Sequence, residues 1–471
     1  MAAKTCIICG GGAGSHEHVF PAALGGRRTN KGIYCTPHNN GFGRHVAELQ
    51  EQLLMFNAIL EVRPDRHDAP RAFAFSDKNG DHFSMLGPSI ETAAPPSIKD
   101  LGLPSGETAT LKFNNKKQFE DWRETQRKNG WEVRIAADSG KSQQRLFAAP
   151  VSVSLRFGGH AGLQAVGYLA LTFFAQYFPD VARSKGLEPF KNFLALDFSK
   201  NEDEAQWKSD LVWWDGRNAD DVVGKSPFQF GHTIVVGVSR SKKRAYAYIS
   251  FFSSLNFGVD LGPVDDPRER MVRVSIDPRA EKAPDDLETA DSETLSIEVD
   301  PAAADLREMI RSGSAESAIG KFLNKVGAWH FERFVSELDG ALKNWAENHS
   351  TDSAQFSAAL VEKHSQRVLN VVSFAVSGLK EELKKNGNIP AALIDMMEKL
   401  IAADDGQSNG LSQQTNTLLE LSKSAIIDVI NQELDSQRAS AEKIAFLLSG
   451  NQGVTAVTQQ VIQPLLLNCL K

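Results

Sequence analysis

Four potential metal ligands near the N-terminus constrain the fold of this chain more than any other feature. They form two closely spaced pairs, Cys6-x2-Cys9 and Cys35-x2-His38. Two such pairs supply the four donors of a closed tetrahedral zinc site. The segment that contains them is too short to be stabilised by a hydrophobic core alone, so a bound metal ion would be needed to hold it together. The fourth cysteine, Cys469, lies near the other end of the chain, which argues against a disulfide framework. We therefore predict that Cys6, Cys9, Cys35 and His38 hold a structural Zn²⁺.

The segment between the two ligand pairs carries a specific set of polar residues and glycines. The pair Glu17-His18 precedes Val19 and Pro21, and a Gly-Gly pair follows at 25–26. Asn30 lies five residues before Cys35, and Asn39 directly follows His38. This order resembles the HNH, or ββα-metal, nucleases, in the branch that reads C-x2-C…EH-V-x-P-x-x-L-G-G…C-x2-C-N-x-x-F-G. The chain departs from it with His38 in place of the usual cysteine, and Asn39 occupies a position that is histidine in other members.

The resemblance implies a catalytic role for each of these residues. His18 would be the general base, a task that suits imidazole because it titrates near neutrality. Glu17 and Asn39 would hold a single catalytic Mg²⁺ or Mn²⁺, since oxygen ligands suit such hard ions. Asn30 would orient the His18 loop through backbone hydrogen bonds. The fold expected for the segment is two strands followed by a helix, and the substrate expected is DNA.

Charge is unevenly distributed along the chain. The net charge of −7 argues against a protein coated with nucleic acid over its whole surface. Residues 1–45, in contrast, carry a single acidic residue, Glu17, against five basic ones. We predict that four of these basic residues contact DNA phosphates: Arg27, Arg28, Lys31 and Arg44. A second basic segment spans 112–145. The basic helix predicted within it, at 116–128, has aromatic residues on or near it that either track nucleic acid or simply belong to the core.

The rest of the sequence predicts an α+β protein of several domains, because the chain is too long for one core. An HNH finger with a supporting helix at 44–60 occupies 1–72, and a mixed α+β middle domain occupies 73–276. That domain would contain a buried helix at 163–178 and an antiparallel sheet at 232–262. The segment 277–304, rich in Asp, Glu, Pro and Ala, is predicted to be an acidic linker or loop. Helical periodicity then predicts a helical assembly or regulatory domain over 305–471.

Together these features predict a metal-dependent DNA endonuclease or nickase, a phosphodiester hydrolase that acts in bacterial defence against foreign DNA. No stretch is apolar enough to cross a membrane and no secretory signal is visible, so we expect a cytoplasmic protein. Two alternatives remain. In the first, the chain is a zinc-finger DNA-binding protein that does not cleave. In the second, its C-terminal helices form a homo-oligomer or bind a regulatory partner, and this keeps the nuclease inactive.

Overall fold

The structure is a computed structural model, and its described residues fall into two compact units. The first unit comprises Met1–Thr125 and Val153–Val326, and the second comprises Gln126–Ser152 and Gly327–Lys471. The predicted boundary between the finger and the middle domain lies inside the first unit, because the finger packs against the buried helix. The described residues are 4–64, 69–76, 82–109, 111, 113, 116–135, 158–196, 211–239, 242–265, 270–280, 286–288, 313–348, 352–385 and 409–469. Most of the predicted linker at 277–304 lies outside them.

The N-terminal finger consists of two short strands followed by a helix. Strands β1 (Glu17–His18) and β2 (Thr29–Asn30) pair antiparallel, and α1 (Thr36–Gln52) follows them. A 3-10 turn, η1 (Ala22–Leu24), lies between the strands, and α2 (Leu54–Ile59) follows α1. Helix α1 begins earlier than predicted because Pro37 occupies its first turn, where a proline costs no hydrogen bond. His38 and Asn39 are therefore helical residues.

An antiparallel six-stranded sheet forms the centre of the first unit. Its strand order is β11-β10-β7-β8-β9-β6. The three strands predicted at 232–262 are present as β7 (His232–Ser239), β8 (Arg244–Phe251) and β9 (Leu255–Pro263). The sheet is wider than predicted, since it also contains β6 (Val212–Trp214), β10 (Arg270–Ile276) and β11 (Asp286–Glu288).

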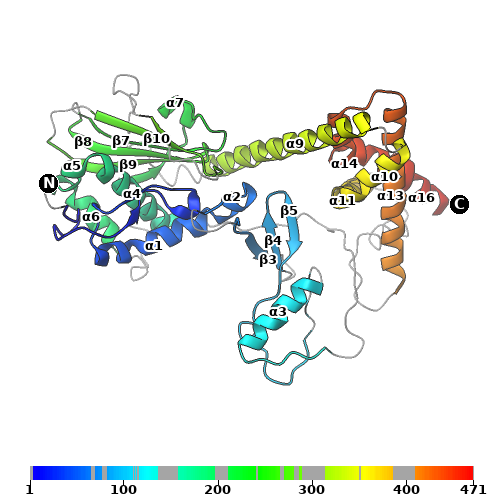
Figure 1. The fold of residues 1–471 in the computed structure, drawn as a ribbon, viewed down its shortest axis with the longest axis horizontal. Coiled ribbons are helices and arrows are strands. Elements are labelled where there is room, and N and C mark those ends of the chain that lie inside the picture. The colour runs from blue at the N-terminus through cyan, green and yellow to red at the C-terminus, as the bar shows by residue number, and fades with distance from the viewer. Residues whose placement is uncertain are drawn as a thin grey trace. The chain divides into compact units, whose positions relative to one another are not determined.

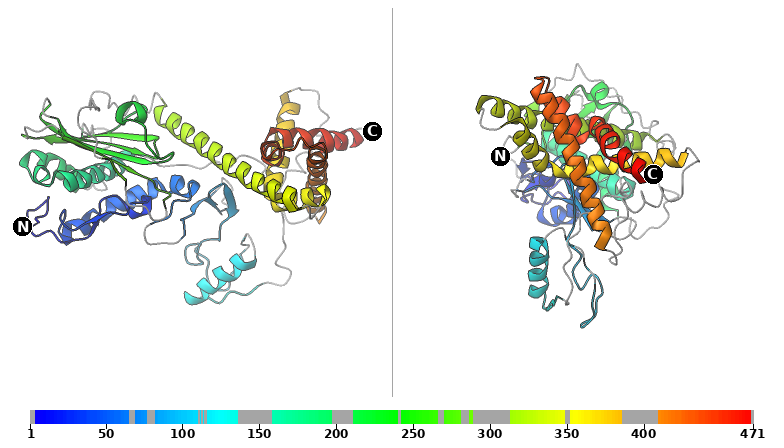
Figure 2. Two further views of the ribbon diagram at one scale, coloured as in Figure 1. Left: turned by 45° about the horizontal axis from the view of Figure 1, so that its top comes forward. Right: turned by 90° about the vertical axis from the view of Figure 1, so that its right-hand side faces the viewer.

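Helices cover both faces of this sheet (Figures 1 and 2). The buried helix α4 (Gly159–Tyr177) packs against β7, β8 and β9 on one face, and α7 (Ala219–Val223) covers the other. Helix α1 of the finger packs on α4, as do α5 (Pro179–Ala182) and α6 (Glu188–Ala195). The fully buried ring of Phe20 joins the finger to the sheet, with its centroid 4.9 Å from that of His232. The finger is thus part of the core of this unit.

A smaller sheet and most of a separate helix also belong to the first unit. Strands β3 (Phe73–Ser76), β4 (His82–Leu86) and β5 (Ser89–Thr92) form an antiparallel meander. The basic helix predicted at 116–128 is present as α3 (Lys116–Lys128). Its Trp122 is buried and its indole nitrogen donates to the carbonyl of Pro95 at 3.0 Å. This aromatic side chain therefore belongs to the protein interior.

The described residues of the second unit are mainly helical, as the periodicity of the C-terminal third predicts. Its hydrophobic core contains fully buried Val368, Val376, Ile426, Ile430 and Ile444. Among the described residues, no helix combines the length and apolar character that a membrane crossing requires. Helix α9 (Ser314–Asn348) begins in the first unit and continues into the second. The other described helices of the second unit are α10 (Ser353–Lys363), α11 (Ser365–Lys385), α13 (Asn409–Asp435), α14 (Ala441–Ser449), α15 (Asn451–Val457), η6 (Thr458–Ile462) and α16 (Gln463–Cys469).

Candidate metal centre and active site

The four predicted zinc ligands form one cluster. Their donor atoms all lie within 4.8 Å of one another. The sulfur of Cys9 is 3.9 Å from that of Cys35, and the sulfur of Cys6 is 3.7 Å from Nδ1 of His38. In a tetrahedral site with zinc–sulfur bonds of about 2.3 Å, neighbouring ligand atoms are about 3.8 Å apart. The Cys₃His set can therefore hold a single metal ion, and its donors suit zinc.

The backbone around Cys6 forms a tight turn that prepares its sulfur for a metal. The amide of Cys6 donates to the carbonyl of Gly11 at 2.7 Å, and that of Gly10 donates back to the carbonyl of Cys6 at 2.9 Å. Burial raises the pKa of the Cys6 thiol, but backbone amides of Cys9, Cys35 and Ile8 outweigh it, so the pKa lies below its usual value. Because the thiolate is the form that binds metals, these amides favour coordination by Cys6.

Glu17 and His18 are adjacent on β1 but lie in different environments. Successive side chains of a strand point to opposite faces. Glu17 is buried, and its Oε1 accepts a hydrogen bond from the hydroxyl of Tyr168 on α4 at 2.5 Å. Burial raises the pKa of the Glu17 carboxyl, and the Tyr168 hydrogen bond only partly opposes this. His18 is half-buried. The expected acid–His pair thus places one side chain against α4 and leaves the other more accessible.

Asn39 lies in the first turn of α1, directly after the predicted zinc ligand His38. Its backbone amide donates to the carbonyl of Cys35 at 2.9 Å, which ties its position to the metal cluster. Its side-chain oxygen Oδ1 is buried and accepts no hydrogen bond from the part of the chain that the structure describes. Buried polar atoms in native proteins nearly always have a partner. An amide oxygen of this kind fits the role of ligand to a hard divalent ion.

Asn30 makes contacts that differ from those the resemblance implies. Its Oδ1 accepts from the amide of Gly32 at 2.6 Å, and its Nδ2 donates to the side-chain oxygen of Gln176 at 2.5 Å. The side chain therefore fixes its own loop to α4, and the expected hydrogen bonds to the His18 loop are not among these contacts. Its strand position is opposite Glu17 in the β1–β2 pair, so Asn30 still influences β1 through the backbone.

The Gly25-Gly26 pair of the motif has a steric explanation. Gly25 ends η1 with a φ of 89°, a left-handed conformation that favours glycine. A Cβ atom on Gly26 would overlap the carbonyl oxygen of Phe20. The chain must turn sharply here because Phe20 and Leu24 are both fully buried. The glycines therefore shape the connection between the two strands.

Three of the four predicted DNA contacts bind groups of the protein itself. Arg44 donates to the carbonyls of Leu194 and Leu196 at the C-terminal end of α6, at 3.1 and 2.9 Å. Arg28 donates to the hydroxyl of Tyr177 at 2.8 Å. Arg27 donates to two backbone carbonyls, those of Arg63 and Ala280. Lys31, in contrast, is exposed.

Several residues that hold the site were not predicted. Tyr168, Thr172 and Gln176 on α4 each hydrogen-bond a finger residue. Their sequence signal is a polar residue at every fourth position of an otherwise apolar helix. His45, which the sequence left open between phosphate contact and solvation, is buried beside the carbonyl of Leu194. It serves packing in this unit.

No family model, no curated protein and no solved structure matches this chain.

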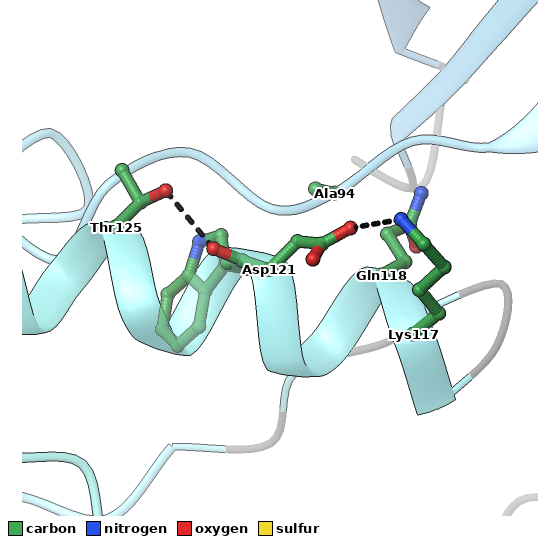
Figure 3. Close-up of a pocket in the computed structure, with 6 residues that line it drawn as sticks. Ala94, Lys117, Gln118, Asp121 and Thr125 are labelled. Atoms are coloured by element: carbon green, nitrogen blue, oxygen red, sulfur yellow. Dashed lines mark hydrogen bonds and ion pairs between the residues drawn. The ribbon is translucent and has the colours of Figure 1, made fainter.

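A surface pocket on α3 offers no competing chemistry. Its polar side chains already bind one another or the backbone (Figure 3). Lys117 pairs with Asp121 at 2.7 Å, and the hydroxyl of Thr125 donates to the carbonyl of Asp121. The pocket is lined by Ala94, Lys117, Gln118, Asp121, Trp122 and Thr125, and none of the predicted site residues is among them.

Proposed function

We propose that this protein is a metal-dependent DNA endonuclease or nickase of the HNH type. The observation that supports the proposal most directly is the Cys₃His cluster beside a ββα unit. That unit carries Glu17 and His18 on its first strand and Asn39 at the start of its helix. The excess of basic over acidic residues in 1–45 favours a nucleic-acid substrate. Defence against foreign DNA is the biological role we propose, by analogy with other nucleases of this kind.

Each residue has a defined task in this proposal. Glu17 and Asn39 hold one Mg²⁺ or Mn²⁺ through oxygen atoms. When bound, such an ion relieves charge on the phosphate and lowers the pKa of bound water. His18 accepts the proton of the attacking water, and its half-buried position leaves it within reach of solvent. The amide oxygen of Asn39 is suited to its task because the fold leaves it without a hydrogen-bond donor among the described residues.

The zinc cluster supports catalysis without taking part in it. Cys6 and Cys9 precede β1, whereas Cys35 and His38 flank the start of α1. A metal ion in the cluster therefore fixes the strand and the helix that carry the proposed catalytic residues. Loss of zinc should abolish cleavage although no catalytic atom is removed.

The decisive experiment compares plasmid cleavage by the wild type with that by His18→Ala. We expect Mg²⁺- or Mn²⁺-dependent nicking or linearisation of supercoiled DNA, suppressed by chelator and lost in H18A. His16→Ala is a matched control, since His16 is exposed and lies two positions earlier on the same segment. Full activity in H18A, or cleavage that persists in chelator, would contradict the proposed mechanism.

A second candidate is a zinc-finger DNA-binding protein that does not cleave, with its helical unit serving assembly. Such an assembly would cover exposed apolar side chains of that unit, for example Phe374 at 69% and Leu467 at 61% exposure. This candidate predicts one bound zinc per chain, DNA binding without products on the gel, and self-association in solution. A monomer by analytical ultracentrifugation at micromolar concentration would count against it.

A further inference from the structure

Helix α4 has an unusual composition for a buried helix. Most of its residues are apolar and buried, yet a polar side chain recurs at every fourth position from Gln164 to Gln176. Two of these, Tyr168 and Thr172, are buried with exposed fractions of 2% and 1%. Burying a polar group is unfavourable unless it finds a partner, so a helix that served only as core would not need them. Their partners therefore indicate their purpose.

Three of these polar residues bind the finger, forming what we call the α4 ladder: Tyr168, Thr172 and Gln176. Thr172 contacts the hydroxyl of Tyr34 at 3.0 Å. The other two bind proposed site residues, because Tyr168 donates to Glu17 and Gln176 accepts from Asn30. Each of these contacts joins chain positions more than a hundred residues apart.

Tyr168 contacts both elements that carry the proposed ligands of the catalytic ion. Its hydroxyl binds Glu17 on β1. Its ring centroid lies 5.5 Å from that of Phe42 and 5.7 Å from that of His45, both on α1. Phe42 is three residues after Asn39, so the two share a face of the helix. Tyr168 is therefore placed between the strand of one ligand and the helix of the other.

The hydrogen bond also leaves Glu17 suitable for a metal ion. The Tyr168 hydroxyl binds Oε1, and the carboxylate has a second oxygen for a cation. Hydrogen bonds to ligating carboxylates orient them, and loss of such a partner typically weakens metal binding 10–100-fold. Gln176 acts similarly on β2, since it fixes the side chain of the residue that pairs with Glu17 across the two strands.

We propose that α4 is a second part of the nuclease centre and that Tyr168 is the positioning residue for Glu17. This inference rests on the proposed function. It extends the site beyond the N-terminal finger to a helix that follows it by about a hundred residues in the sequence. The finger alone would accordingly hold zinc but would lack the contact that orients its carboxylate.

The test measures Mn²⁺ binding to the zinc-loaded full-length chain by electron paramagnetic resonance, which detects free Mn²⁺ and does not require activity. The variants are Tyr168→Phe, which removes only the hydroxyl, and Glu17→Gln, which removes the proposed ligand. The matched control is Tyr248→Phe. Tyr248 is also fully buried, but it lies on β8 and its hydroxyl has no hydrogen-bond partner among the described residues. Zinc content and melting temperature are recorded for every variant.

We expect Y168F to raise the Kd for Mn²⁺ by 10–100-fold, with its zinc content and ring packing retained, and Y248F to bind Mn²⁺ like the wild type. Gln176→Leu is a second variant, expected to lower the cleavage rate at saturating Mn²⁺. If Y168F binds Mn²⁺ like Y248F while E17Q does not bind it, the ladder inference is overturned and the proposed function stands. If E17Q binds Mn²⁺ like the wild type, Glu17 is not a ligand, and the inference falls together with that part of the proposed function.

Discussion

The imidazole Nε2 of His45 lies 3.1 Å from the carbonyl oxygen of Leu194, and the side chain is buried with 2% exposed. Burial lowers the pKa of His45 to about 4, assisted by the positive charge of Arg44 and only partly opposed by the Leu194 hydrogen bond. Above its pKa the ring is neutral and donates Nε2–H to the carbonyl. This contact joins α1 of the finger to the end of α6.

The depressed pKa predicts acid-sensitive stability. Because the folded-state pKa lies below the unfolded value, this contribution is fully present above about pH 6.5 and is lost as the pH falls towards 4. His45→Gln retains a donor for the Leu194 carbonyl but has no group that titrates in this range. Between pH 7 and pH 4, we therefore expect the free energy of unfolding to fall by about 3 kcal/mol more in the wild type than in this variant. Urea unfolding across this pH range measures the difference. An equal change in the free energy of unfolding with pH for the two proteins would contradict the lowered pKa of His45.

Loss of one cluster ligand should release the zinc ion. Cys9→Ser and Cys35→Ser each break the Cys₃His set, and we expect zinc content to fall from one ion per chain to near zero. His38→Cys should keep the ion, because a Cys₄ set is an equally good zinc site. Cys469→Ser is the control, since this cysteine lies outside the Cys-x2-Cys and Cys-x2-His pairs of the sequence. Elemental analysis of the purified variants checks this, and a full zinc complement in C35S would refute the assignment.

The Gly-Gly turn of the finger should tolerate no side chain at position 26. Gly26→Ala places a Cβ against the carbonyl oxygen of Phe20, and we expect a loss of about 3 kcal/mol or more. Gly41→Ala is the matched change in α1, where a Cβ meets nothing within 4 Å. It should stabilise the helix by about 0.5–1 kcal/mol. Thermal unfolding of both variants gives the comparison, and equal melting temperatures would show that the turn relaxes.

Arg44 and Lys31, both predicted to contact DNA, should differ in their effects. Arg44 caps the carbonyls at the end of α6, so Arg44→Ala should cost about 1 kcal/mol of stability and leave the salt dependence of DNA binding unchanged. Lys31 is exposed, so Lys31→Ala should leave stability unchanged and reduce the salt slope by about one. Binding isotherms at several salt concentrations, with melting curves, separate the two. A reduced salt slope with unchanged stability in Arg44→Ala would instead assign Arg44 to the DNA-binding surface.

Local sequence patterns predicted the features whose signals lie within a few residues of one another. The Cys-x2-Cys and Cys-x2-His spacings predicted that four ligands come together, and these four side chains do form a cluster that could hold a metal ion. Alternating or continuous apolar runs predicted β7, β8 and β9. The helix at 163–178 was predicted to be buried because it is apolar almost all round, and most residues of α4 are indeed buried.

Contacts between distant positions could not be read from such patterns. Nothing near Glu17 indicates that its partner is Tyr168, because the pairing depends on how α4 is placed by the sheet. The same holds for Arg28 and Arg44, whose charge predicted phosphate contacts but whose guanidinium groups bind a tyrosine hydroxyl and helix-end carbonyls. The roles of His18 and Asn39 in cleavage stay predictions that the proposed experiments address.

The metal cluster also has a consequence for how the chain folds. The second and third ligands in the sequence, Cys9 and Cys35, are 26 positions apart. A cross-link that closes a loop of this size lowers the conformational entropy of the unfolded chain, which corresponds to a free energy of about 3.5 kcal/mol at 25 °C. The loop contains β1 and β2, so an ion captured early would bring the two strands together while the rest of the chain is still disordered. The partners on α4 lie 138–151 positions later than the finger residues Tyr34, Asn30 and Glu17 that they bind. We therefore expect zinc to set the order of assembly, with a preformed finger acting as the template on which α4 and the sheet condense.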